Sequence, residues 1–164
     1  MEDSEKKKTT LSIKKILINS LILITVILFL IPIGIYLFIV EIIFRIAFHA
    51  YSNRTKKKII LVTSDSPIWQ DYVNDNLLPL FGESVSVLNW SQRKLWDNSK
   101  WEVKAFHHWG GKSEFNPLVI INKNLFQIKV IRLYEAFVDY KHGKPGKLAK
   151  KEMEIRKAIN AMEI

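Results

Sequence analysis

Ser66 is the residue whose type and position best suit a binding site in this chain. It is followed by Pro67 and by an apolar repeat at helical spacing, so it has the place of a helix cap with proline at the first helical position. The free amides and the dipole at such a helix start favour an anion. The plainer interpretation is an ordinary cap without a ligand, and both interpretations stay open.

His107 and His108 stand next to Trp109 and suggest a metal site or an acid–base pair. Adjacent residues point to different sides of a helix or a strand, however, so two neighbouring histidines rarely bind one ion. The 164 residues include no cysteine, which excludes disulfides, thiolate metal sites and thiol catalysis. We therefore expect no metal, no cofactor and no catalytic residue.

Tryptophans and basic residues alternate between residues 90 and 112. Such a surface can stack nucleic-acid bases or rest at a membrane surface, whereas packing of the tryptophans in a core is the plainer alternative. The formal net charge of +9 suits a solubilising surface or attraction to anionic lipid. Because no nucleic-acid recognition motif is present, we do not expect a nucleic-acid partner.

Residues 16–44 form an almost uncharged apolar run, which predicts a transmembrane helix. The run is too long for the core of a secretory signal, and no cleavage site follows it. Pro32 and Gly34 lie near its centre, so the run forms either a kinked single span or a hairpin that turns at residues 32–34. Basic residues flank both ends of the run, so the rule that places the more basic flank in the cytoplasm does not choose between the two orientations. We predict a single span with the C-terminal domain in the cytoplasm.

The rest of the chain divides into a basic N-terminal tail (1–15), a basic juxtamembrane linker (45–58) and one domain (59–164). Residues 41–53 have apolar positions at helical spacing and form either an interfacial helix or a continuation of the span. Cations after the apolar run suit lipid headgroups, so membrane lipids are expected partners. The residues predicted to lie at the membrane interface are Arg45, Arg54, Lys56, Lys57 and Lys58.

The residue pattern of the domain predicts alternating strands and helices. Residues 59–62 and 85–88 are short β-branched runs joined by a helix that starts at residues 66–67 and ends near Gly82, so the two strands are expected to be parallel. A second helix begins after Ser91. The runs 118–121 and 127–134 are separated by a short polar turn, which favours an antiparallel hairpin, and a final helix starts at Pro145.

This order, β-α-β followed by a helical connection and then β-β-α, resembles the thioredoxin fold in its compact glutaredoxin form across residues 58–159. The segment 66–69 (SPIW) stands where that family carries Cys-x-x-Cys, and residues 116–117 (NP) precede the third strand, where the family has a cis-proline. The resemblance implies a small three-layer α/β domain behind the transmembrane helix. A different small α/β fold that begins with β-α-β remains the alternative.

Both cysteines of the family are replaced here, so disulfide exchange is impossible. The resemblance then implies a redox-inactive member that binds a protein partner or serves as a scaffold. One alternative is a glutathione-dependent transferase that uses the Ser66 hydroxyl; another is a structural anchor that binds anionic lipid. The residues that the resemblance places at a ligand are Ser66, Pro67, Trp69, Asn116 and Pro117.

Overall fold

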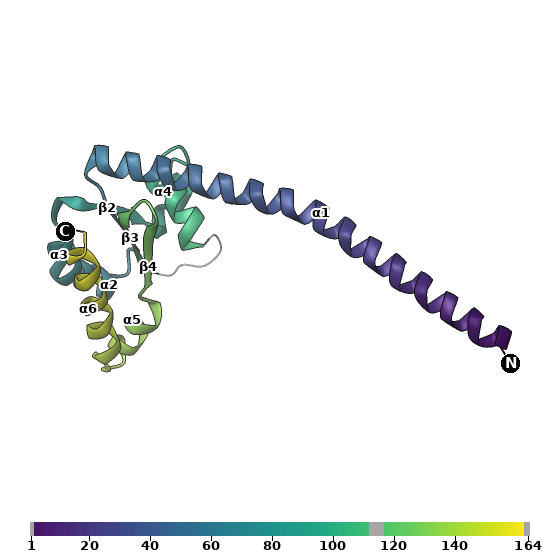
Figure 1. The fold of residues 1–164 in the computed structure, drawn as a ribbon. Helices are drawn as coiled ribbons and strands as arrows, with labels where there is room; N and C mark the ends of the chain where they lie inside the picture. The colour runs from purple at the N-terminus through teal and green to yellow at the C-terminus, as the bar shows by residue number, and fades with distance from the viewer. Residues whose placement is uncertain (1, 112–116, 163–164) are drawn as a thin grey trace. The chain divides into compact units, whose positions relative to one another are not determined.

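The computed structural model describes residues 2–111 and 117–162 of the chain (Figure 1). It divides into two compact units, Met1–Phe44 and Arg45–Ile164. One helix, α1 (Glu2–Thr55), contributes residues to both. The second unit contains a four-stranded mixed sheet with helices, which confirms the α/β class expected from the sequence.

The first unit consists of the N-terminal part of α1. From Leu17 onward the helix is long and apolar enough to cross a membrane. It continues through Pro32 and Gly34 without the turn that a hairpin requires. Thr25 Oγ1 donates to the Leu21 carbonyl at 2.9 Å, the backward bond that makes a hydroxyl tolerable in hydrocarbon. The continuous helix favours a single span, which stays a prediction.

The sheet has the strand order β2-β1-β3-β4, from β1 (Ile59–Thr63), β2 (Val85–Asn89), β3 (Leu118–Asn124) and β4 (Gln127–Arg132). β1 and β2 are parallel, whereas β3 runs antiparallel to both β1 and β4. The β1–β2 crossover and the short β3–β4 connection therefore confirm the pairings expected from the sequence.

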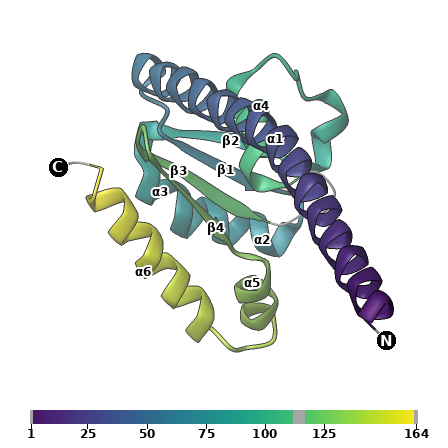
Figure 2. The same ribbon diagram turned by 45° about the vertical axis from the view of Figure 1, so that its right-hand side comes forward.

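One face of the sheet is covered by the helices that follow β1 and β4. The crossover comprises α2 (Pro67–Tyr72), a π-helical turn (Val73–Leu77) and α3 (Leu78–Phe81). It ends at Gly82, whose φ of 54° is accessible to glycine. α5 (Tyr134–Lys141) and α6 (Gly146–Asn160) complete this layer, and Figure 2 shows α6 and α4 on different sides of the sheet.

The other face is covered by α4 (Trp101–Ala105), a π-helical turn (Phe106–Gly110) and the last turns of α1. Phe48 packs here and is only 1% exposed. Ser52 is also buried, and its hydroxyl donates to the Lys57 carbonyl at 2.8 Å. Residues 41–53 are predicted to form either an interfacial helix or a continuation of the span. Helix α1 continues through them, and its turns around Phe48 and Ser52 pack in the core of the second unit.

Two elements differ from those predicted. Residues Trp90–Leu95 form a 3₁₀ turn rather than an α-helix. The strand expected over 127–134 ends at Arg132, because Leu133 has helical backbone angles (φ −112°, ψ −9°) and its carbonyl accepts from the Phe137 amide at 2.8 Å, which begins a helix. Helix α5, which has no counterpart among the predicted elements, then starts at Tyr134. The final helix begins within one residue of its predicted start.

Candidate functional site

The strand register brings the predicted site residues to one end of the sheet. Thr63 pairs with Asn89, and Val62 pairs with Leu118, so Pro117 follows opposite Thr63. Arg132 closes the same end because it pairs with Leu118. We call this end the Ser66 edge and define it by residues 63–67, 89–91, 117 and 132. This edge lies at the carboxyl ends of the parallel strands β1 and β2, the end at which α/β sheets commonly bind ligands.

A polar network fixes the loop that carries Ser66. The Asp65 amide donates to Ser91 Oγ at 3.1 Å, and the Asn89 side-chain amide donates to the Asp65 carboxylate. Asn89 Oδ1 accepts from the Ser91 amide at 3.0 Å. The loop after β1 is therefore tied to the turn after β2, as parallel pairing of the two strands allows.

Ser66 itself is exposed and makes no capping hydrogen bond through its side chain. Its carbonyl begins the helix by accepting from the Gln70 amide at 2.8 Å, and Pro67 occupies the first helical position. The hydroxyl thus remains available to donate to an anion or to a peptide carbonyl. Without a thiol anywhere in the chain, the edge can bind but cannot exchange disulfides.

The structure places Trp69 beneath the edge, in the core, with only 1% of its surface exposed. Its ring lies 4.2 Å from Phe137 and 5.3 Å from Tyr72, measured between ring centroids. Within the described residues, its Nε1 and Thr63 Oγ1 are buried without a hydrogen-bond partner. A ligand at the edge would meet Ser66 and Pro67 directly, whereas Trp69 would act only by supporting the helix.

Pro117 is buried at the start of β3, and its carbonyl is engaged by Leu133. Asn116 lies outside the described residues, and with it the peptide bond expected to be cis. The structure therefore brings Pro117 to the same end of the sheet as Ser66, while the isomer of that bond stays a prediction from the resemblance.

The five cations predicted to lie at the membrane interface differ in the contacts that they make within the second unit. Arg45 Nη1 donates to the Phe126 carbonyl at 3.3 Å, and its guanidinium lies 5.9 Å from the Trp109 ring centroid. Lys57 Nζ donates to the Glu83 carbonyl at 2.7 Å. The remaining three are exposed or half-buried: Arg54, Lys56 and Lys58.

His107 and His108 lie on the π-helical turn that follows α4. His108 is exposed, while His107 is half-buried against Phe106 and Trp96. Among the described residues, no group of three or more histidine and carboxylate side chains is placed to hold a metal ion. The ring of His108 lies edge-on to that of Trp109.

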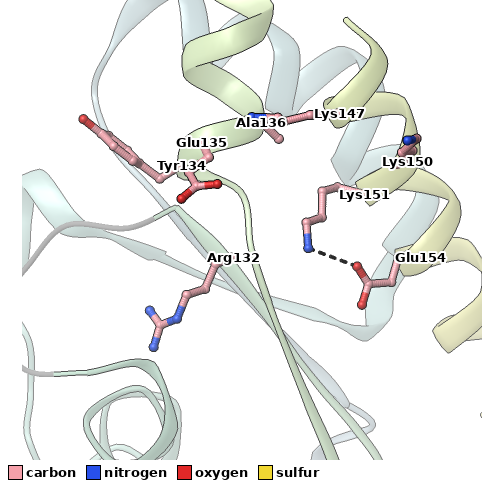
Figure 3. Close-up of a pocket in the computed structure, with 8 residues that line it drawn as sticks. All are labelled: Arg132, Tyr134, Glu135, Ala136, Lys147, Lys150, Lys151 and Glu154. Carbon is pink, nitrogen blue, oxygen red and sulfur yellow. Dashed lines mark hydrogen bonds and ion pairs between the residues drawn. The ribbon is translucent and has the colours of Figure 1, made fainter.

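A concavity of about 520 Å³ lies between β4, α5 and α6 (Figure 3). Its lysines come from α6 and are Lys147, Lys150 and Lys151. Arg132 donates to the Gly110 carbonyl at 2.9 Å, and in Figure 3 its guanidinium points away from the α6 lysines. Lys147 pairs with Asp139 and Lys151 with Glu154. The cations therefore do not converge on one point, as an anion site would require.

No protein-family model, curated protein or solved structure matches the chain.

Proposed function

We propose that this protein is a membrane-anchored, redox-inactive thioredoxin-like module that binds a protein partner at the Ser66 edge. The parallel β-α-β unit, the β3–β4 hairpin and the C-terminal helix support the thioredoxin-like assignment, because the resemblance rests on those elements. The absence of cysteine removes thiol chemistry and leaves binding as the activity that such a domain can retain.

The observation that carries the proposal is the position of Phe48 in the domain core. Only seven residues separate it from Val40, the last residue of the exposed apolar run. A connection of this length holds the domain close to the membrane. Two residues of the segment 49–57 contact the end of the sheet where β1 starts. His49 is hydrogen-bonded to Asn122, and Lys57 donates to the Glu83 carbonyl. The Ser66 edge is the opposite end of the sheet and is thus free to meet a soluble or membrane-bound partner.

Photocrosslinking tests this proposal in intact membranes. Benzoylphenylalanine is introduced at Ser66 in the full chain and, as a matched control, at Glu83, which is exposed at the other end of the sheet. We expect an adduct of defined mass from position 66 and none of that mass from position 83. Equal crosslinking from both positions, or none from position 66, would contradict a partner site at the Ser66 edge.

The exposed Ser66 hydroxyl also supports a second candidate, a glutathione-dependent transferase in which this hydroxyl donates to the glutathione thiolate. Retention of the full chain in detergent on immobilised glutathione measures this binding. Loss of retention in Ser66→Ala, with normal retention in Ser99→Ala, would favour the transferase. Absence of retention in the unmodified chain would remove it.

A further inference from the structure

The turn between β3 and β4 presents a large apolar side chain to the outside. Phe126 is 77% exposed, although a phenylalanine gains stability when it leaves water. Asn124 holds the turn in one shape, because its side-chain oxygen accepts from the amides of Phe126 and Gln127, each at 3.0 Å. The ring is therefore presented by a fixed turn that has side-chain support.

The same turn is joined to the segment of α1 that enters the domain. Arg45 Nη1 donates to the Phe126 carbonyl at 3.3 Å. Arg45 is five residues beyond Val40, which is about 7.5 Å along a helix. An arginine at that distance from the end of a span places its charge among lipid headgroups while its stem stays in apolar surroundings. The hydrogen bond thus brings Phe126 to the same depth as Arg45.

The neighbouring residues fit a lipid surface better than a protein groove. Ile46, next to Arg45, is 50% exposed in the domain, and Lys123 precedes the turn. Apolar side chains beside basic ones match the acyl boundary and the anionic headgroups above it. Leu95, which is more exposed still (83%), follows the carboxyl end of β2, at the end of the sheet away from this turn.

From these contacts we infer that the Phe126 turn inserts into the headgroup boundary of the bilayer that α1 spans. The inference rests on the anchoring in the proposed function and adds a second membrane contact to it. With two contacts, α1 and the turn, the domain is restrained in tilt as well as in distance.

The cysteine-free chain allows a direct depth measurement. Single cysteines in the full chain, as Phe126→Cys, Leu95→Cys and Ile33→Cys, are spin-labelled and reconstituted in vesicles of phosphatidylcholine and phosphatidylglycerol. Collision rates with oxygen, which concentrates in lipid, and with a water-soluble nickel chelate report depth at each label. We expect the oxygen-to-nickel ratio to be several-fold higher at positions 33 and 126 than at position 95.

The label at position 33 separates the inference from the anchoring on which it rests. A high oxygen-to-nickel ratio at position 33 together with a low, water-like ratio at position 126 would overturn the membrane contact of the turn and leave the anchor intact. A water-like ratio at 33 would overturn both. Adding Arg45→Gln to the Phe126→Cys chain is expected to lower the ratio at 126 while the ratio at 33 stays unchanged; an unchanged ratio at 126 would remove the role of Arg45.

Discussion

At the scale of single residues, Trp69 contributes to the packing of the core and not to the binding surface. Its ring fills the core, whereas its Nε1 has no acceptor among the described residues. Trp69→Phe removes that buried N–H and is expected to lower the free energy of unfolding by only about 1 kcal/mol, because deleting an unpartnered donor offsets part of the lost volume. Trp69→Ala leaves a large cavity and should lower it by about 3–5 kcal/mol. Urea unfolding in detergent micelles measures both, and equal losses would contradict this division.

Tyr51 makes the stability of the domain sensitive to alkaline pH. Burial, aided by its hydrogen bond to the Glu102 carboxylate, raises the pKa of Tyr51 from 10.0 to about 12. The folded chain therefore holds this proton more firmly than the unfolded chain does. The stabilisation is complete below pH 10 and is lost as the pH rises toward about 12.

The resulting prediction is a urea midpoint that holds below pH 10, the ordinary pKa of this tyrosine, and declines between pH 10 and about 12. In Tyr51→Phe the decline should be smaller, while Tyr134→Phe, at an exposed tyrosine, should behave like the unmodified chain. Tyr72, whose pKa is raised by burial and by its bond to Glu152, accounts for the remaining decline. If the urea midpoint declined equally with pH in Tyr51→Phe and in the unmodified chain, the contribution of Tyr51 would be refuted.

At the scale of elements, the last turns of α1 give the sharpest test of where the domain begins. Phe48 is buried against the sheet, whereas its near neighbour Ile46 is half exposed. Phe48→Ala is expected to lower the free energy of unfolding by about 3–5 kcal/mol, because a cavity opens in the core. Ile46→Ala should have a much smaller effect. Similar small effects at both positions would mean that this segment lies outside the domain.

The sequence predicted elements with strong local signals. The run at residues 59–62 predicted β1, Ser66 and Pro67 predicted the start of α2, and Gly82 predicted the end of the crossover. Helix α5 escaped prediction because no capping residue precedes Tyr134 and because the alternation of β4 seemed to continue into it. The role of Phe48 escaped as well, since apolar helical spacing does not tell whether lipid or a sheet will cover the face.

The candidate site was predictable only in part. The resemblance placed Ser66 and Pro117 at one ligand, and the register brings both residues to the same end of the sheet. The side-chain network of Asp65, Asn89 and Ser91 depends on the exact alignment of β1 with β2, which no local pattern specifies. The same limit applies to Arg45 and Phe126, which are far apart in sequence and meet only when the hairpin packs beside α1.

At the scale of the whole molecule, membrane topology decides which partners the domain can meet. Because α1 continues through residues 32–34, we expect a single span with the two ends of the chain on opposite sides. The basic chain, with its net charge of +9, favours a domain beside the anionic cytoplasmic leaflet. The N-terminal tail should then be outside the cytoplasm.

Single cysteines test this topology without a background signal, because the chain has none of its own. With Ser4→Cys and Lys144→Cys in separate chains, an impermeant maleimide applied to intact cells should label only position 4. Labelling of position 144 alone would move the domain outside the cytoplasm, where a cytoplasmic partner cannot reach the Ser66 edge. Labelling of neither position until lysis would place both ends in the cytoplasm. That result would require the apolar run to turn within the bilayer, against the continuous helix seen at Pro32 and Gly34.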